Sequence, residues 1–510
     1  MTYIWDMTTY SAVVTTGIYC RPGCGARPLL GNTRTYEHPA AAEAAGFRAC
    51  LRCRPYRVAA SVEAGAPELV CRAWQLIIDG VLDGGTEAAL ATRIGLSQRH
   101  LRRLFLKYLG ATPDQLARSR RAHFARRLLD DSDLTVLDVA FASGFGSLRQ
   151  FNRTMREVFR AAPSDLRERR RRADRLVADG GLVLRLPFVP GYDWAAVRDF
   201  LAVRAVPGVE EVDGDTYRRT ITVDGAPGVL EVSPGGEGHL LLRAHLPYWE
   251  GLIHVVGQVT RLLGVEADHG AGVAALSADP VLGPLVRARP GLAVPGAWSA
   301  LDIGVRAVLG RGRTPGETAD RLGALVRTLG TRVPGLPGGL THTFPEATAI
   351  AKRMEEHATG TQAGKGAATG SETDVITAPT RSEAAVIGAL AGEEAAVVTT
   401  PAGEEAAVVG APAGEEAAVV GALAADVAGE HEVLDHGTGP DTMAALPYAD
   451  RDLRHDLAFR LGHPDAFPLA DPALRAALED LGLDPATSMD RWRPWRSLAA
   501  AHLMAHGDAL

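Results

Sequence analysis

Apolar residues between about residues 67 and 172 recur with helical spacing, in two similar helix-turn-helix units. In the first unit, a helix over residues 89–94 is followed by a turn and by Ser97, a residue type that caps helices well. In the second unit, a helix over residues 136–142 is followed by a turn and by Ser147. The helix after each serine carries one apolar stripe: Leu101, Leu104, Phe105 and Tyr108 in the first unit, and Phe151, Met155, Val158 and Phe159 in the second. The pattern predicts an all-α domain with two polar helix faces.

The spacing of apolar residues changes beyond this domain. A basic run over residues 167–175 is expected to form the domain's last helix. Residues 182–187 and 217–223 then alternate like strands, with Pro- and Gly-rich turns between them, and residues 193–203 show a helical pattern. Further on, helical patterns return. We therefore expect an α+β domain followed by a second helical domain.

A low-complexity stretch over residues 353–435 interrupts that second helical domain. The phrase Ala-Gly-Glu-Glu-Ala-Ala-Val-Val occurs three times with an 11-residue period, from Ala391, Ala402 and Ala413. The glycine in every copy, together with Pro401 and Pro412, argues against one continuous helix. Because residues 371–430 contain no aromatic residue and many acidic ones, we expect a disordered acidic insert.

The net charge of −7 hides two oppositely charged segments. Residues 91–175 carry 20 Lys and Arg against 9 Asp and Glu, whereas residues 371–430 carry one Arg against 11 Asp and Glu. A polyanion such as DNA would bind the first segment. No uncharged apolar run reaches the length of a membrane span, so we expect no membrane partner.

Four of the five cysteines lie close together near the start of the chain, as Cys20-x3-Cys24 and Cys50-x2-Cys53. Two close pairs separated by a loop can converge on one tetrahedral ion, and thiolates suit Zn²⁺. Disulfides are disfavoured because we find no secretory signal and no further cysteine framework. The spacing predicts one zinc site, and free thiols without a targeting signal lead us to expect a reducing, cytoplasmic location.

The residues around these cysteines, Val14–Arg27 and Gly46–Pro55, closely resemble the metal-binding domain of the Ada adaptive-response regulators. In that family the cysteines hold structural zinc, and the first accepts a methyl group from a methylphosphotriester in DNA. The resemblance implies that Cys20 is this acceptor. Methylation would turn a thiolate into a neutral thioether and so favour phosphate binding. Arg27 and Arg48 are candidate backbone contacts, with solvated surface arginines as the alternative.

The phrase over Asp138–Phe151 resembles the AraC-type double helix-turn-helix signature, as does Gly110–Pro113 at the end of the first unit. The resemblance implies sequence-specific binding of double-stranded DNA. In the major groove, Arg can read guanine and Gln can read adenine. The candidate DNA contacts are Arg99, Arg102 and Arg103 in the first unit, and Arg149, Gln150 and Arg153 in the second. The alternative is a helical bundle with a solvated basic face, which the signature phrase disfavours.

The residues from Leu182 to about Leu263 resemble the N-terminal α+β domain of the bacterial 3-methyladenine DNA glycosylase II family. Asp302–Gly310 and Arg491–Ser497 resemble parts of its helical catalytic region. Members of this family flip a damaged base into an aromatic pocket, where an aspartate stabilises positive charge as the glycosidic bond breaks. The resemblance places Asp471 at that position; the alternative role for Asp471 is a helix cap.

Two motifs of that family are altered in this chain. Its hairpin turn, Leu-Pro-Gly-x-Gly, grips a phosphate with backbone amides, but this chain has Leu446–Asp452, in which Tyr448 and Asp450 replace both glycines. Its wedge, Gly-Gln-x-Val-Ser, reads Gly310–Thr314 here, with arginines at two positions. Acidic groups near a phosphate predict weaker DNA binding. The insert also occupies a place where helices of this family are expected.

We therefore expect a multidomain protein. Its parts are a zinc-bound α+β domain (1–60), an all-α double helix-turn-helix domain (66–175), an α+β glycosylase N-terminal domain (180–275), a degenerate all-α helix-hairpin-helix glycosylase domain (276–352 and 436–510) and the acidic insert (353–435). The expected function is methyl transfer from DNA to a zinc-held cysteine, which activates a transcription factor, joined to excision of damaged bases. The activator role implies RNA polymerase as a partner. Two alternatives stay open: a sensor whose glycosylase-like module is inactive, and a regulator whose zinc is purely structural.

Overall fold

The structure is a computed structural model that describes residues 9–21, 24, 30–57, 67–171, 174–176, 181–189, 191–265, 270–336, 338–366, 415–429 and 432–507. The chain divides into two compact units, residues 1–197 with 231–296 and residues 198–230 with 297–510. The expected multidomain architecture of mixed α+β and all-α parts is confirmed. Among the described residues, no helix is long and apolar enough to cross a membrane.

The cysteine-rich domain is built on a small mixed sheet. Its elements are β1 (Tyr10–Val13), β2 (Ile18–Cys20), a 3-10 turn η1 (Leu30–Asn32), β3 (Thr33–Tyr36), α1 (Pro39–Ala44), β4 (Arg48–Ala49) and a second turn η2 (Pro55–Arg57). The strand order is β3-β1-β2-β4. Strand β1 is antiparallel to β2 and β3, whereas β2 and β4 run parallel with Tyr19 opposite Ala49. Because β2 and β4 are parallel, the residues that follow them leave the sheet at the same end.

Seven helices form the basic region: α2 (Glu68–Ile78), α3 (Glu87–Arg93), α4 (Gln98–Leu109), α5 (Pro113–Asp131), α6 (Val136–Ala142), α7 (Leu148–Phe159) and α8 (Pro163–Glu168). The predicted caps are confirmed. Ser97 Oγ accepts from the backbone N–H of His100 at 3.3 Å, and Ser147 Oγ accepts from that of Gln150 at 3.2 Å. The predicted stripes are confirmed too, since Leu101, Phe105, Phe151, Met155, Val158 and Phe159 are buried, and Leu104 and Tyr108 are partly buried against the same core.

The basic run over residues 167–175 is not one helix, because α8 ends at Glu168. Its arginines instead bind the loop between α5 and α6. Arg170 and Arg175 lie 2.9 and 2.6 Å from the carboxylate of Asp133, and Arg167 donates to the carbonyl oxygen of Leu134 at 2.7 Å. Pairing with this loop separates like charges that a continuous helix would stack along one face.

A second sheet follows the basic region. Its strands are β5 (Leu182–Pro187), β6 (Glu210–Asp213), β7 (Thr216–Val223), β8 (Ala226–Pro234) and β9 (His239–His245), in the order β5-β9-β8-β7-β6. In the antiparallel register of β5 with β9, Leu184 lies opposite Leu242. The associated helices are α9 (Trp194–Ala202), α10 (Leu252–Leu263), α11 (Gly270–Leu276) and α12 (Leu282–Ala288). The strands predicted over 182–187 and 217–223 and the helix over 193–203 are confirmed.

The C-terminal region is helical, as predicted. Its elements are α13 (Ala300–Leu309), α14 (Pro315–Leu329), α15 (Ala347–Gly366), α17 (Glu415–Ala428), η4 (Glu432–Leu434), η5 (Thr442–Ala445), α18 (Arg451–Arg460), α19 (Pro472–Asp480), α20 (Pro485–Ser488), η6 (Met489–Trp492) and α21 (Arg496–Gly507). Helix α13 packs against α14, α17 and α18. Helix α19 packs against α21.

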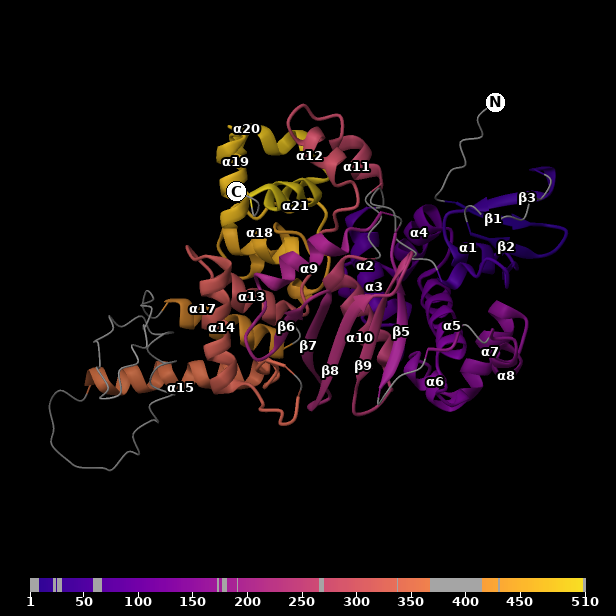
Figure 1. Cartoon of the computed structure of the whole chain (residues 1–510), viewed down its shortest axis with the longest axis horizontal. Helices are drawn as coiled ribbons and strands as arrows, with labels where there is room; N and C mark the ends of the chain where they lie inside the picture. Colours follow the sequence, from indigo (N-terminus) through magenta and orange to yellow (C-terminus); the bar gives the residue numbers. More distant parts are fainter. Residues whose placement is uncertain are drawn as a thin grey trace. The chain divides into compact units, whose positions relative to one another are not determined.

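Two of these helices overlap the range of residues 353–435 expected for the acidic insert. Helices α15 and α17 extend into it from both ends and lie side by side (Figure 1). The third copy of the repeat contributes the first residues of α17, and its Glu416 is buried against Arg313 and Arg321 at 3.2 and 3.0 Å. Leu423 is fully buried beside Gly304. The first two copies lie outside the described residues.

Candidate functional site

The four cysteines of the N-terminal domain form one cluster. Cys20 ends β2 and Cys50 follows β4, so the parallel pairing brings them to the same end of the sheet. The backbone N–H of Cys50 donates to the carbonyl oxygen of Tyr19 at 2.9 Å, which fixes this register. Short turns then bring Cys24 and Cys53 back to the same point. All four Sγ atoms lie within 4.8 Å of one another.

The cluster fits a zinc ion. Four thiolates at about 2.3 Å from a tetrahedral zinc ion are roughly 3.8 Å apart, a spacing that small side-chain adjustments reach from the observed one. The hydrogen bond between Cys20 and Cys53 raises the pKa of the Cys20 thiol and lowers that of Cys53 to about 5. Cys20 is the most enclosed of the four, at 7% exposure, whereas the other three are half-buried. The quartet predicted from spacing alone therefore fits one zinc ion.

The residue next to Cys20 connects the cysteine cluster to helix α5. The hydroxyl of Tyr19, fully buried, donates to Glu43 Oε1 at 2.6 Å. His123 Nε2, on α5, lies 2.6 Å from the same oxygen and 3.2 Å from the Tyr19 hydroxyl. A three-membered polar contact thus joins β2, α1 and α5.

The segment after Cys53 makes a second connection to α5. Arg57 lies 2.8 Å from Asp131, and the hydroxyl of Tyr56 donates to Asp130 at 3.1 Å. Arg54 lies 2.7 Å from Asp174. Both aspartates of α5 are buried, so each ionic contact is made where water is largely excluded. The cysteine domain is therefore attached by charged groups to the helix that joins the two helix-turn-helix units.

In the first unit, the predicted DNA contacts differ in what they touch. Arg99 and Arg103 are exposed and form no ion pair among the described residues. Arg102 is also exposed, but its guanidinium is paired with the buried Glu87 of α3. Glu87 also accepts from the backbone N–H of Asp114 at the start of α5 at 3.0 Å. Arg102 therefore helps to hold α3, α4 and α5 together.

In the second unit, the predicted contacts lie at the start of α7. Arg149 and Arg153 are exposed and Gln150 is half-buried. Arg153 lies 3.8 Å from Glu157, one turn further along the helix. Elsewhere, Arg48 lies in β4 and its Nη1 donates to the carbonyl oxygen of Ala49 at 3.3 Å. Arg27 lies outside the described residues.

Asp471 stands at the first turn of α19. Its Oδ1 accepts from the backbone N–H groups of Ala473 and Leu474 at 2.9 and 3.2 Å, so it caps the helix. Its Oδ2 lies 3.7 Å from Nη2 of Arg204. The same carboxylate lines a cavity of about 120 Å³. Asp471 therefore both caps α19 and lines the cavity.

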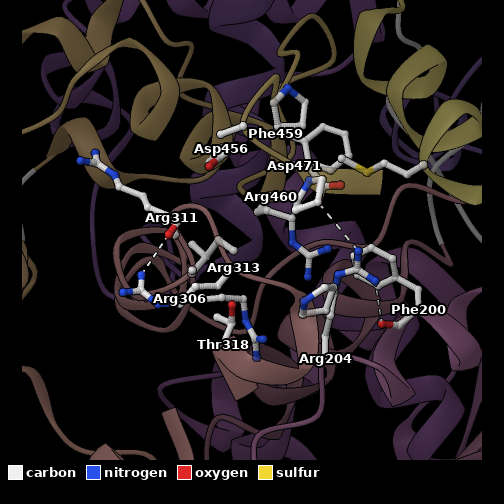
Figure 2. Close-up of a pocket in the computed structure, with 18 residues that line it drawn as sticks. Phe200, Arg204, Arg306, Arg311, Arg313, Thr318, Asp456, Phe459, Arg460 and Asp471 are labelled. Atoms are coloured by element: carbon white, nitrogen blue, oxygen red, sulfur yellow. Dashed lines mark hydrogen bonds and ion pairs between the residues drawn. The ribbon is translucent and has the colours of Figure 1, made fainter. Parts of the chain in front are cut away.

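The cavity around Asp471 is rich in arginines, and Figure 2 shows several of them beside the carboxylate. Its charged lining residues are Arg204, Arg306, Arg311, Arg313, Arg460, Asp456 and Asp471. Burial and the charges of Arg204 and Arg306 lower the pKa of Arg460 to about 9. Burial and the negative charge of Asp471 raise the pKa of Asp456 to about 8, so Asp456 is mostly protonated at neutral pH.

The two residues that replace glycines in the hairpin turn, Tyr448 and Asp450, both make contacts with neighbouring residues. Asp450 caps α18 by accepting from the backbone N–H of Leu453 at 2.8 Å, and it lies 2.7 Å from Arg311. The hydroxyl of Tyr448 donates to Asp426 of α17 at 2.8 Å. The residues that replace the family's glycines therefore stabilise the surrounding helices.

Sequence reasoning missed three arginines near Asp471. Arg204 lies in the turn after α9, whereas Arg306 and Arg460 lie in α13 and α18, and the three positions are far apart in the sequence. Only the packing of three helices reveals that they meet.

Sequence models of three protein families match separate parts of the chain. The metal binding domain of Ada matches residues 4–56, a helix-turn-helix domain matches residues 90–169, and the AlkA N-terminal domain matches residues 183–299. These matches confirm the three expected resemblances.

Among curated proteins, the chain is similar over nearly its whole length to one from Mycobacterium tuberculosis (strain H37Rv), named "Probable bifunctional transcriptional activator/DNA repair enzyme AlkA". The two are 35% identical over 512 residues, which cover 96% of this chain and 91% of the relative. Two Escherichia coli (strain K12) proteins match parts of it. DNA-3-methyladenine glycosylase 2 is 31% identical over 32% of this chain and 57% of its own length. The bifunctional transcriptional activator/DNA repair enzyme Ada is 33% identical over 28% of this chain and 41% of its own length.

Proposed function

The chain belongs to the family of bifunctional transcriptional activators and DNA repair enzymes. On this basis we propose a separate function for each of its domains. The cysteine domain senses alkylated DNA by accepting a methyl group. The helix-turn-helix domain binds double-stranded promoter DNA and recruits RNA polymerase in the cytoplasm. The C-terminal module excises damaged bases. The observation that carries the sensing role is the convergence of four cysteine sulfurs within 4.8 Å.

The proposed methyl acceptor is Cys20. Its sulfur attacks the methyl carbon of a DNA methylphosphotriester, an S–C bond forms and the C–O bond breaks. The electron pair of that bond stays on the phosphate oxygen, which regains its negative charge. Zinc held by the four cysteines would keep their thiols deprotonated at neutral pH. The neutral thioether then leaves the site with one negative charge fewer, which favours contact with phosphates.

Peptide mass spectrometry after incubation with methylphosphotriester DNA tests this step. We expect one added methyl group on Cys20. Cys71 serves as an internal control, because burial raises the pKa of its thiol to about 11 and keeps it protonated. A methyl group on Cys24, Cys50 or Cys53 would contradict the assignment.

The enclosure of Cys20 favours a second candidate function. At 7% exposure, Cys20 is the least exposed of the four residues, which suits a purely structural zinc site. The same mass spectrum separates the two candidates. No methyl group on any cysteine, in protein that still holds zinc and binds DNA, would support the structural role.

For the C-terminal module we propose excision of alkylated bases such as 3-methyladenine, with Asp471 stabilising the oxocarbenium-like sugar. Its support is the position of Asp471 in the wall of a cavity, with one carboxylate oxygen held by the α19 backbone. A fixed carboxylate opposite a developing positive charge lowers the barrier electrostatically. The capping role and the nearby Arg204 favour the alternative of a sensor with an inactive module.

A single-turnover excision assay on alkylated DNA separates these possibilities. The wild-type protein should release base, and Asp471→Asn, which keeps a helix-capping oxygen, should abolish release without unfolding the module. If neither protein releases base at low salt, the module is not an excision enzyme.

A further inference from the structure

The two carboxylate oxygens of Asp471 have different partners. Oδ1 accepts from the backbone N–H groups of Ala473 and Leu474. Oδ2 lies 3.7 Å from Nη2 of Arg204, and the side chains of Asp471 and Arg204 are 21% and 10% exposed. Because both are largely shielded from solvent, salt and water screen the attraction between them only weakly. The carboxylate oxygen that is not used in the helix cap therefore already faces a positive charge.

The guanidinium group of Arg204 also covers an aromatic ring. Its carbon lies 3.9 Å from the centre of the Phe200 ring, and its Nη1 donates to the carbonyl oxygen of Phe200 at 3.4 Å. Phe200, Arg204 and Asp471 all line the cavity, and dashed lines in Figure 2 join Arg204 to the other two. Arg204 thus combines an ion pair with a cation–π contact, as a bound flat cation would.

A purine that is methylated on a ring nitrogen is itself a flat cation while it is attached to DNA. Its positive charge would be attracted to Asp471 and to the face of an aromatic ring, as that of Arg204 is. Two cations cannot share one position beside one carboxylate, because like charges repel. Arg204 must therefore leave before such a base can take its place.

The size of the cavity leads to the same conclusion. With Arg204 in place the cavity volume is about 120 Å³, whereas a cavity that holds a single benzene ring measures about 150 Å³. A purine has two fused rings, so it needs the room that Arg204 takes. Departure of Arg204 would enlarge the cavity and remove one of its positive charges, and both changes favour a cationic base.

The position of Arg204 in the chain allows its side chain to leave without a change of fold. Arg204 lies in the turn that follows α9, outside any helix or strand. Its neighbour Val203 is 51% exposed, so this turn borders solvent. Side-chain rotations are among the fastest motions of proteins and break no backbone hydrogen bond. Exchange of Arg204 for a base thus needs only a change of side-chain conformation.

We propose that Arg204 is an autoinhibitory residue, which occupies the position of the cationic base until a flipped base displaces it. The proposal rests on the base excision proposed above. Arg204 has to leave for any base, damaged or not, so it lowers the apparent affinity of the cavity for all of them by the same factor. An undamaged base offers Asp471 no positive charge, so this common penalty leaves its occupancy lowest.

Base release by full-length Arg204→Ala tests the proposal. One duplex carries 7-methylguanine, a cation, and a second carries the uncharged base hypoxanthine at the same position. Release is measured under single-turnover conditions with protein below saturation. We expect Arg204→Ala to release 7-methylguanine about tenfold faster than the wild type, because the competing cation is gone. Arg353→Ala on α15, whose partner Glu356 lies 3.5 Å away, removes an arginine that does not line the cavity and should leave the rate unchanged.

Methylguanidinium, which has the head group of the missing side chain, gives a readout that does not need excision. Saturation transfer from the protein to its methyl protons, measured at millimolar concentration, should be stronger with Arg204→Ala than with the wild type. The double variant Arg204→Ala/Asp471→Asn should lose this gain. The same compound should also slow base release by Arg204→Ala towards the wild-type rate.

Slower or unchanged release of 7-methylguanine by folded Arg204→Ala would overturn the proposal, because Arg204 would then support Asp471 or have no effect on it. Faster release of hypoxanthine alone would overturn it too, since Arg204 would then select by charge. Arg204→Gln, which keeps the side-chain stem without its charge, replaces the alanine variant if that protein does not fold. If no protein releases base but methylguanidinium binds Arg204→Ala through Asp471, the excision function fails and the cation site that Arg204 fills stands. Equal binding of methylguanidinium to all three proteins would refute that cation site, whether or not base is released.

Discussion

Arg311 and Asp450 lie 2.7 Å apart, so one changed residue of the wedge motif and one changed residue of the hairpin turn form an ion pair with each other. The wedge position has gained a positive charge and the hairpin turn has gained a negative one. The acidic group that seemed set to repel a phosphate is therefore largely neutralised. The two changes are compensatory, and they are best understood together.

Substitutions at these two positions can separate the contribution of the ion pair from that of the helix cap. Asp450→Ala removes both the partner of Arg311 and the cap of α18, which should cost about 1 kcal/mol of folding stability. The pair itself is solvent-exposed, so a double-mutant cycle with Arg311→Ala should give a coupling below about 1 kcal/mol. Thermal unfolding measures both. Asp450→Gly should therefore weaken the module, although it restores the family's residue.

Removal of a zinc ligand should unfold the cysteine domain. Cys50→Ala should abolish stoichiometric zinc binding and the protection of its backbone amides from hydrogen exchange, because structural zinc contributes folding free energy directly. Cys71→Ala, outside the cluster, is the control. A domain that stays folded without metal would contradict the zinc assignment.

Arg99 and Arg149 are expected to read bases. Each substitution by alanine should reduce the preference for the promoter over random DNA by roughly 1–3 kcal/mol. Arg102→Ala should behave differently: its guanidinium is paired with Glu87, so it should destabilise the fold more than it relaxes specificity. Competition binding with specific and random duplexes, beside a melting curve, separates the two effects. Equal losses on both duplexes would mean that Arg99 and Arg149 contact phosphate only.

His123 is expected to couple the cysteine domain to the DNA-binding helices. Because it contacts Glu43 and Tyr19, His123→Ala should leave zinc binding intact and reduce the gain in promoter affinity on methylation by about 1 kcal/mol. Tyr19→Phe removes only the hydroxyl and should act in the same direction. An undiminished gain in both variants would show that the contact is structural alone.

The raised pKa of Asp456 predicts that the folding stability of the protein depends on pH. Its pKa is about 8 in the folded protein and near 3.8 ordinarily, so between these values the folded form holds a proton that the unfolded form has lost. Stability should therefore fall as the pH rises from about 4 to 8. Asp456→Asn should remove this slope and raise stability at pH 8 by on the order of 2 kcal/mol. Thermal unfolding across that range measures the effect, with Asp213→Asn as a surface control.

The sequence predicted local features well, because each depends on neighbouring residues. The caps Ser97 and Ser147, the strand over 182–187 and the cysteine quartet follow from spacing and residue type. It could not show that Arg204 and Arg460 meet at Phe200, because that contact depends on how α9 and α18 pack. Nor could composition reveal that the last repeat is helical, because its stability comes from Glu416 and Leu423 in contact with α13 and α14.

The residues that follow the third copy of the repeat distinguish it from the two earlier copies. In the third copy the position three residues beyond the final valine is Leu423, whose side chain is fully buried. The same position is Pro401 after the first copy and Pro412 after the second. Proline has no backbone N–H and clashes with the preceding helical turn, so neither earlier copy can form the same helix in contact with α13 and α14. Gain or loss of an earlier copy, a common event in repetitive genes, would change the length of the chain without changing which segment docks.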